Sequence, residues 1–385
     1  MGELRVLELY SGIGGMHYAL KESGLPAQVV AAVDINTVAN KIYKHNFPDT
    51  ALWNKTIEGI TLDDFNELNF DLLLMSPPCQ PFTRIGIQGD VADSRTKSFL
   101  YILDLLPRLC RPPRFILLEN VKGFESSTAR ERLVKTLTEC GYTFQEIMVS
   151  PTAVGIPNSR LRYFLIARIP SENTSTLTPS KIADVFPVPA ETDSFTYPTI
   201  LSPACEAASR PAEEAQEAPY LYKLETALDA QRKKSQNSCL SVGQIQDFLE
   251  PQLEVNLEQY LLSSKVLLRY GRILDIVRPT CRRSVCFTKG YGRYVQGTGS
   301  VLQGCTETEL ETVFTDLDQC SEEEKLQRLS KLKLRYFTPR EVANLMGFPQ
   351  TFCFPEQIST IQQYRVLGNS LNVVVVARLL QLLVS

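Results

Sequence analysis

Apolar runs of strand length alternate with helical stretches through the first 170 residues of the chain. The strand-like runs lie at residues 4–9, 29–33, 71–75, 115–118, 142–150 and 162–168. Between them, a helical apolar spacing begins at Met16 and recurs over residues 38–45, 98–109 and 129–139. Strands that alternate with helices favour an α/β fold with a doubly wound sheet. Because the strands are mostly apolar, the sheet is predicted to be mostly parallel and covered by helices on both faces.

Polar residues follow several of these strands directly. The first strand runs into the turn Ser11-Gly12-Ile13-Gly14-Gly15, and the second ends at Asp34. In open α/β sheets, ligands bind beyond the carboxyl ends of the strands. A glycine turn with an acidic residue about 20 positions later is the arrangement that holds the ribose of an adenosine-containing cofactor. The plain alternative is an ordinary turn beside a strand-end aspartate.

The segment Ser76-Pro77-Pro78-Cys79-Gln80 follows another of the strands. Proline fixes the backbone φ angle and donates no hydrogen bond, so the two prolines form a rigid support for Cys79. Most lone cysteines are buried and inert, and we expect this of Cys110, Cys140 and Cys353. At Cys79, the rigid support and the place at a strand end favour a reactive thiol.

Three more charged residues are candidates for the same ligand site beyond the strand ends. Glu119 ends the strand at 115–118, and an ordinary solvated or capping acid is the plain alternative. Arg160 and Arg162 alternate in an extended segment, which places them on one face. The plain alternative for them is a pair of surface arginines.

The net charge and the cysteine pattern exclude several classes to which this protein could belong. The 385 residues carry a net charge of −3, which excludes a wholly basic nucleic-acid coat but allows a local basic face. The ten cysteines form no Cys-x-x-Cys pair and only two histidines exist, so we expect no metal. We find neither a signal peptide nor an unbroken apolar run of membrane-spanning length. We therefore expect a cytoplasmic protein with reduced thiols, without a membrane and with some nuclear presence allowed.

The sequence divides into three parts. Residues 1–180 carry the α/β pattern and the candidate site, residues 181–335 form a second region, and residues 336–385 return to the first. Within the second part, residues 187–218 are rich in Ser, Thr, Pro, Glu and Ala without glycine, which predicts a disordered insert. In the third part, Thr338-Pro339-Arg340-Glu341 predicts a capped helix that Gly347 ends. Residues 373–384 predict a helix packed on a core.

Taken together, these residues resemble the cytosine-5 methyltransferase family. The resemblance covers residues 4–168 and roughly 270–385. It rests on the glycine turn, Asp34, Pro77-Pro78-Cys79-Gln80, Glu119-Asn120-Val121, Arg160-Leu161-Arg162, the Thr338–Pro349 segment and Gly368-Asn369-Ser370-Leu371. Asn158 departs from the glutamine usual in the family. Cys286-Phe287-Thr288 is similar to the branch of the family that methylates transfer RNA, notably aspartate tRNA.

The resemblance implies a Rossmann-like fold that binds S-adenosylmethionine and a smaller target-recognition domain at residues 181–335. It implies that Cys79 adds to carbon 6 of cytosine, that Glu119 holds or protonates ring nitrogen 3, and that Arg160 and Arg162 position the base. The cofactor residues it implies are Ile13, Gly14, Gly15, Asp34, Ile57, Glu58, Ser76 and Ser370. The substrate-binding residues it implies are Arg282, Arg283, Cys286, Phe287, Thr288 and Lys289. The segment 80–97 is expected to close over a flipped nucleotide.

The expected partner is tRNA bound by a monomeric enzyme. Six basic residues and one acid lie between Arg272 and Arg293, and Tyr291 and Tyr294 interleave with them in a pattern that suits stacking on exposed bases. A solvated charged face is the plain alternative. A DNA cytosine-5 methyltransferase would use the same catalytic residues, and DNA is expected to bind more weakly. A catalytically weak cofactor-binding regulator is a third possibility. A nicotinamide-dependent oxidoreductase would have no use for Pro77-Pro78-Cys79.

Overall fold

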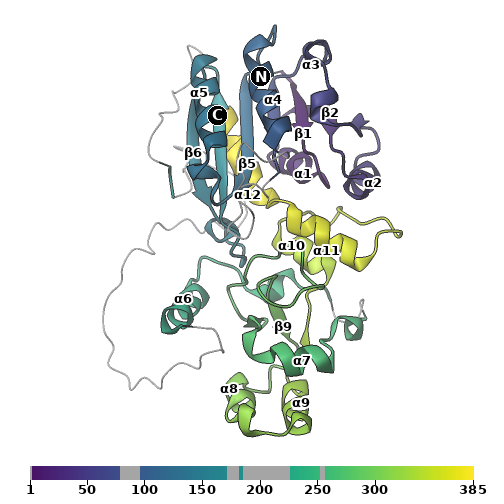
Figure 1. Cartoon of the computed structure of the whole chain (residues 1–385), viewed down its shortest axis with the longest axis vertical. Coiled ribbons are helices and arrows are strands. Elements are labelled where there is room, and N and C mark those ends of the chain that lie inside the picture. Colours follow the sequence, from purple (N-terminus) through teal and green to yellow (C-terminus); the bar gives the residue numbers. More distant parts are fainter. Residues whose placement is uncertain (1, 79–95, 171–181, 185–225, 252–255) are drawn as a thin grey trace.

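A seven-stranded sheet forms the larger part of the molecule. The computed structural model describes residues 2–78, 96–170, 182–184, 226–251 and 256–385 (Figure 1). The strands are β1 (Leu4–Leu9), β2 (Ala27–Val33), β3 (Leu52–Trp53), β4 (Leu72–Met75), β5 (Phe115–Val121), β6 (Thr143–Val149) and β7 (Arg162–Arg168). Their order in the sheet is β3-β2-β1-β4-β5-β7-β6. Strand β7 runs in the opposite direction to the other six, so it pairs antiparallel with β5 and with β6. The predicted doubly wound, mostly parallel sheet is confirmed.

Helices cover both faces because the strands alternate between two hydrophobic clusters. Val6 and Leu74 point into one cluster, which α1 (Gly15–Glu22), α2 (Thr37–Asn46) and α12 (Val373–Val384) complete. Leu7 and Leu73 point into the other. The helices of that second face are α3 (Leu62–Leu68), α4 (Lys97–Leu105) and α5 (Thr128–Glu139). Both faces of each central strand are therefore buried, as the unbroken apolar runs predicted.

The C-terminal segment closes one face of this sheet. Helix α10 (Pro339–Leu345) begins with the predicted capping box of Thr338 and Glu341, and Gly347 follows it with a φ of 75°. Helix α11 (Thr360–Asn369) leads to α12, which packs against α1, β5 and β7. Residues 360–384 are long and apolar enough to cross a membrane by composition alone, with a mean hydropathy of 1.6. Most of that stretch is buried inside the protein, as expected for a core helix.

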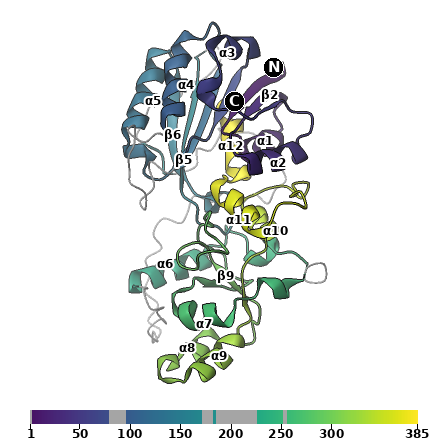
Figure 2. The same cartoon turned by 45° about the vertical axis from the view of Figure 1, so that its right-hand side comes forward.

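A smaller region lies beyond α10 and α11, which sit between it and the large sheet in both views (Figures 1 and 2). Its three-stranded sheet has the order β10 (Leu334–Arg335), β9 (Val301–Gln303) and β8 (Ile276–Val277). Its helices are α6 (Ala227–Ser238), α7 (Ser264–Tyr270), α8 (Leu310–Phe314) and α9 (Glu322–Ser330). A third hydrophobic cluster, which includes Leu267, Val301 and Phe314, forms its core.

Short 3-10 turns connect these elements. They are η1 (Ile57–Gly59), η5 (Leu106–Arg108), η6 (Phe124–Ser126), η7 (Pro151–Val154), η8 (Ile245–Phe248), η9 (Leu257–Tyr260), η10 (Gly271–Ile273) and η11 (Leu317–Gln319). Three predictions fall outside the described residues: the reactive Cys79, nearly all of the closing segment 80–97, and the insert at 187–218.

Candidate active site

Four adjacent strands bring the predicted polar residues to one edge of the sheet. Strand β1 pairs in parallel with β2 and with β4, and β4 pairs in parallel with β5. The glycine turn follows β1, Asp34 follows β2, Ser76-Pro77-Pro78 follows β4, and Glu119 lies near the end of β5. The carboxyl ends of these strands meet at the same edge, which is where ligands bind in sheets of this kind.

Two backbone amides hold the Asp34 carboxyl group beside the glycine turn. Its Oδ2 accepts a hydrogen bond from the Gly12 amide at 2.9 Å, and its Oδ1 accepts one from the Asn36 amide at 2.7 Å. Burial raises the pKa of Asp34, and these amide donors oppose that rise only in part. The carboxyl group is thus held at a fixed place beside the turn.

Tyr10 shapes the same turn, although the sequence did not single it out. It is a non-glycine residue with a φ of 58°, in the left-handed region where side chains are strained. The Ser76 hydroxyl donates to the Tyr10 carbonyl at 3.1 Å, and the Tyr10 hydroxyl donates to Ser98 at 3.0 Å. Burial raises the pKa of Tyr10 most, and the nearby Glu58 carboxylate adds to the rise. Strained residues often cluster at functional sites, and the positive φ could not be read from the tyrosine itself.

Two of the three glycines of the turn allow close packing from two directions. Gly14 has a φ of 85°, and a Cβ there would lie 2.5 Å from the ring of Phe47 in the chain just after α2. A Cβ on Gly15 would lie 3.0 Å from the Ser370 hydroxyl and 3.2 Å from Leu371. The structure therefore brings Ser370 from the C-terminal motif against the turn, next to the buried Ile13.

Ile57 and Glu58 belong to η1 after β3, the edge strand beside β2. The Ile57 side chain is buried and Glu58 is exposed.

Glu119, Arg162 and Cys286 form the charged part of the site. Arg162 Nε lies 3.4 Å from Glu119 Oε1, and its Nη2 lies 3.9 Å from the Cys286 sulfur. Burial raises the pKa of Glu119, and the two arginines offset that rise only in part. For Cys286, burial would raise the thiol pKa, but the guanidinium groups of Arg160 and Arg162 outweigh it and the pKa is lowered. The cluster thus places a carboxyl group of raised pKa and a thiol of lowered pKa beside the same arginine.

Arg160 connects three segments of the chain. Its guanidinium donates to the carbonyls of Phe287 at 2.9 Å, Gly368 at 3.1 Å and Ser370, and to the Cys286 sulfur at 3.3 Å. The residue is only 3% exposed. Three backbone carbonyls and the Cys286 sulfur thus hold the guanidinium in place, whereas its buried Nε has no hydrogen-bond partner among the described residues.

Asparagines support this arrangement. Asn158, which departs from the family pattern, donates to Ser284 Oγ at 3.0 Å and to the Val285 carbonyl at 3.1 Å. Asn120 donates to the Pro77 carbonyl at 3.5 Å and so links the end of β5 to the proline pair. The polar contact from position 158 therefore joins the large sheet to the segment that carries Cys286.

The predicted substrate contacts in the smaller region need correction. Arg283 is buried and paired with Asp275, and Phe287 is packed between Tyr291 and Phe337. Tyr291 is also buried, so it is not available to stack on a base. All three side chains hold the region together and none is placed to contact a substrate.

Other basic residues of this stretch are also engaged. Arg272 pairs with Asp318 at 2.9 Å, Arg278 pairs with Glu309 at 2.7 Å, and the Arg282 guanidinium donates to the Val242 carbonyl. Lys289 and Arg293 are exposed and form no ion pair with another described residue. The ring of Tyr294 is exposed and lies under the Arg293 guanidinium at 5.3 Å.

The backbone of Thr288 and Lys289 packs closely against Gly368. A Cβ on Gly368 would overlap the backbone of both residues. The segment after Cys286 therefore lies directly on the end of α11, where only glycine leaves room for it.

Known proteins resemble this chain along its whole length. The family described as "C-5 cytosine-specific DNA methylase" matches residues 4–385. The chain is 55% identical to the human tRNA (cytosine(38)-C(5))-methyltransferase over 100% of both chains. It is 37% identical to a Dictyostelium discoideum DNA (cytosine-5)-methyltransferase, covering 100% of this chain and 95% of the relative. A crystal structure of a Spodoptera frugiperda DNMT2 mutant superposes with a TM-score of 0.78 at 38% identity, covering 100% of both chains. The chain therefore belongs to the C-5 cytosine methyltransferase family.

Proposed function

We propose that this enzyme methylates carbon 5 of a cytosine in the anticodon loop of a transfer RNA, with aspartate tRNA as its natural substrate. The observation that carries this proposal is the full-length similarity, at 55% identity, to an enzyme named for cytosine 38 of tRNA. Position 38 of a tRNA belongs to the anticodon loop. The contacts of Cys286 with Arg160 and Arg162 give further support, because they join the segment typical of the tRNA branch to the candidate active site.

The turn after β1 fits S-adenosylmethionine. The Ser11 hydroxyl within the turn is buried and has no hydrogen-bond partner among the described residues, so a ligand group can satisfy it. Ile13, Gly14 and Gly15 would hold the methionine part, Asp34 the ribose, Ile57 and Glu58 the adenine, and Ser76 and Ser370 would close the pocket. When bound, S-adenosylmethionine supplies a methyl group on a positively charged sulfur.

In the proposed mechanism, Cys79 supplies a thiolate that adds to carbon 6 of the cytosine and makes carbon 5 nucleophilic. Glu119 holds a proton at ring nitrogen 3, which stabilises the negative charge that develops in the ring. Its raised pKa supports this role because a buried carboxyl keeps its proton more readily. Loss of the carbon 5 proton then expels Cys79. Arg162 lies against Glu119 and stabilises charge at the same place.

The substrate surface in this proposal is smaller than the sequence suggested. Lys289 and Arg293 are the exposed cations next to Cys286 in the chain, and Tyr294 adds an exposed ring. These three residues suit a folded RNA whose loop bases are unstacked, because aromatic rings and cations bind such bases and the adjoining phosphates.

Duplex DNA is the second candidate substrate. It is favoured by the similarity to the Dictyostelium discoideum protein named as a DNA (cytosine-5)-methyltransferase. The same catalytic residues would serve it. A cofactor-binding regulator would bind S-adenosylmethionine yet transfer no methyl group.

Methyl transfer from labelled S-adenosylmethionine to separate pools of tRNA and duplex DNA tests these candidates. We expect label in tRNA, lost when cytosine 38 of aspartate tRNA is replaced by uridine, and much less label in DNA at the same salt concentration. Cys79→Ala should abolish transfer but keep cofactor binding. RNA with 5-fluorocytosine at the target should trap wild-type enzyme covalently, and trapping that persists in Cys79→Ala would exclude this nucleophile. Equal or greater label in DNA would support the DNA reading, and no transfer to either would support a regulator.

A further inference from the structure

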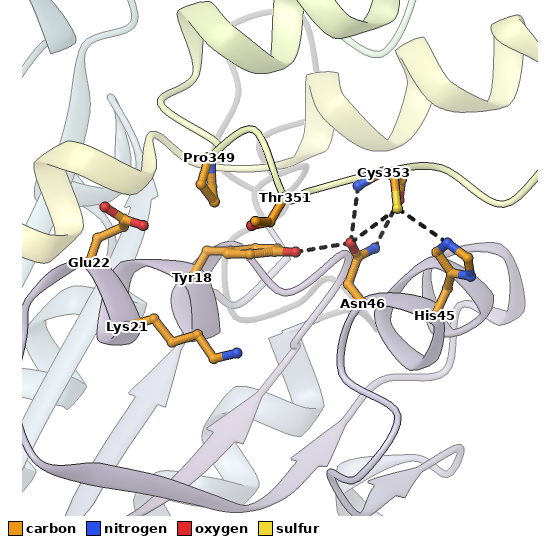
Figure 3. A pocket seen from close by; sticks show the side chains of 8 residues that line it. All are labelled: Tyr18, Lys21, Glu22, His45, Asn46, Pro349, Thr351 and Cys353. Carbon is orange, nitrogen blue, oxygen red and sulfur yellow. Dashed lines mark hydrogen bonds between the residues drawn. The ribbon is translucent and has the colours of Figure 1, made fainter.

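A second thiol lies outside the site described above. A hollow of about 290 Å³ opens between α1, the end of α2 and the segment that follows α10 (Figure 3). Cys353 and His45 lie side by side in its lining, and both side chains are exposed. The expected burial of Cys353 is therefore wrong, and so is that of Cys110, which is also exposed. The reason is that residue 353 sits on the outer face of the segment after α10, although its neighbour Phe352 is buried.

Asn46 fixes the position of this thiol. Its side-chain oxygen accepts hydrogen bonds from the Cys353 amide at 3.1 Å and from the Tyr18 hydroxyl at 2.9 Å. Its side-chain nitrogen donates to the Cys353 carbonyl at 2.9 Å. Arg340 donates to the Phe352 carbonyl at 2.7 Å and restrains the segment just before the cysteine. The backbone at Cys353 is therefore held on two sides while its sulfur stays open to solvent.

The imidazole of His45 faces this sulfur. His45 Nε2 lies 3.2 Å from Cys353 Sγ, which is hydrogen-bond distance for a thiol (Figure 3). His45 is in the last turn of α2. The chain has two histidines, and His17 is buried against Tyr43. Cys353 is thus the described cysteine that has an imidazole placed to take its proton.

We propose that Cys353 is a site of oxidation by hydroperoxides, with His45 as its base, and that a small thiol such as glutathione then captures the oxidised sulfur. His45 Nε2 takes the thiol proton, and the thiolate attacks one peroxide oxygen. The O–O bond breaks, the sulfur is oxidised to a sulfenic acid, and the leaving oxygen takes the proton back from the imidazolium. The small thiol then forms an S–S bond with this sulfur and releases water.

Accessibility separates this thiol from Cys286. Cys286 lies between Arg160 and Arg162 within the candidate active site and is only partly exposed, whereas Cys353 opens directly into the hollow. Reactive cysteines combine access to solvent with a neighbouring cation or base. Cys353 and His45 provide both without taking part in methyl transfer, so their chemistry can be followed in its own right.

Site-resolved mass spectrometry of the whole protein tests the proposal. The protein is exposed to limiting hydrogen peroxide at pH 7 with dimedone as a trap for sulfenic acid, or with glutathione to form the mixed disulfide. We expect Cys353 to react at least about tenfold faster than the exposed Cys110, since a positioned base typically contributes that much or more. Cys353 reacting no faster than Cys110 would overturn the proposal.

Two variants identify the role of the imidazole. His45→Gln should remove the rate advantage of Cys353 at pH 7, whereas Lys41→Gln, an exposed change on the same helix, should retain it. A His45→Gln variant in which Cys353 still reacts as fast as in wild type would contradict the role of His45 as base. Thermal melting of both variants checks that each remains folded.

Discussion

The strand-end site and the smaller region use their arginines in different ways. At the strand ends, Arg162 faces the Glu119 carboxyl group and the Cys286 thiol. In the smaller region, Arg272, Arg278 and Arg283 pair with carboxylates that belong to the same region. Arg162 therefore lies beside groups that can take part in chemistry, whereas the three arginines of the smaller region stabilise the fold. A count of basic residues therefore overstates the surface that can meet a nucleic acid.

The sharpest test of this difference compares the two arginines that alternate before β7. Arg160→Ala leaves the carbonyls of Phe287, Gly368 and Ser370 without their donor, at about 1–3 kcal/mol each. We expect at least about 4 kcal/mol less stability together with loss of methyl transfer. Urea denaturation with a parallel activity assay measures both.

Arg162→Ala is the matched variant. Its contacts are with Glu119, with Cys286 and with the neighbouring Leu161 carbonyl, so it should lose activity while its stability changes by less than about 1.5 kcal/mol. Equal losses of stability in the two variants would mean that both arginines are structural.

In the smaller region, the matched pair is Arg283 and Lys289. Arg283→Ala leaves Asp275, whose side chain is 13% exposed, with Lys233 as its remaining cation, and we expect a loss of about 3 kcal/mol in stability. Lys289→Ala should leave stability unchanged, weaken tRNA binding modestly, and reduce the slope of affinity against salt by about one. Denaturation curves and binding isotherms at several salt concentrations distinguish the two. A folded Arg283→Ala protein with a reduced salt slope would restore this arginine as an RNA contact.

The same contrast explains which features could be predicted from the sequence. Asp34 and Glu119 were found because strand ends are fixed by the apolar pattern, and parallel pairing then places them at one edge. The burial of Arg283 and Phe287 was not found, because it depends on partners such as Asp275 and Phe337 whose positions follow only from the tertiary fold. The junction at Arg160 joins residues more than 120 positions apart, and no local pattern reveals it.

One acid in the large sheet and one in the smaller region should make stability depend on pH in different ways. Burial raises the pKa of Glu8 in β1 from 4.5 to about 8, which the Tyr43 hydroxyl at 2.8 Å offsets only in part. For Asp275, burial alone would raise the pKa, but Arg283 and Lys233 lower it overall. Between pH 4.5 and 8 the folded protein retains a proton on Glu8 that the unfolded chain has lost. Stability from Glu8 therefore falls as pH rises through this range, by up to about 1.4 kcal/mol per pH unit.

Glu8→Gln should remove this slope, so its stability relative to wild type should rise steadily from pH 5 to pH 8. Asp275→Asn should show a constant loss over the same range, because a lowered pKa makes that contribution disappear only in more acidic solution. Urea midpoints at four pH values measure both. Parallel curves for Glu8→Gln and wild type would mean that Glu8 is already ionised in the folded protein.

We expect the smallest effect on stability and activity from deleting residues 187–218. Both flanks of this segment are anchored: Ala183 bonds to the backbone of Glu146 and Met148 beside β6, and Thr226 caps α6. Deleting 187–218 leaves nine residues between Asp184 and Thr226, which can span about 30 Å at most. Shortening the loop changes its closure entropy by only about 1 kcal/mol, in the stabilising direction.

We therefore expect the deletion variant to fold and to methylate tRNA at nearly the wild-type rate. A second variant keeps the length but replaces the segment with a Gly-Ser repeat, which separates the reach of the loop from its sequence. If the deletion fails and the Gly-Ser variant is active, the segment acts only as a spacer. If both fold but neither methylates tRNA, its side chains contact the substrate, and the RNA surface of the smaller region extends beyond Lys289, Arg293 and Tyr294.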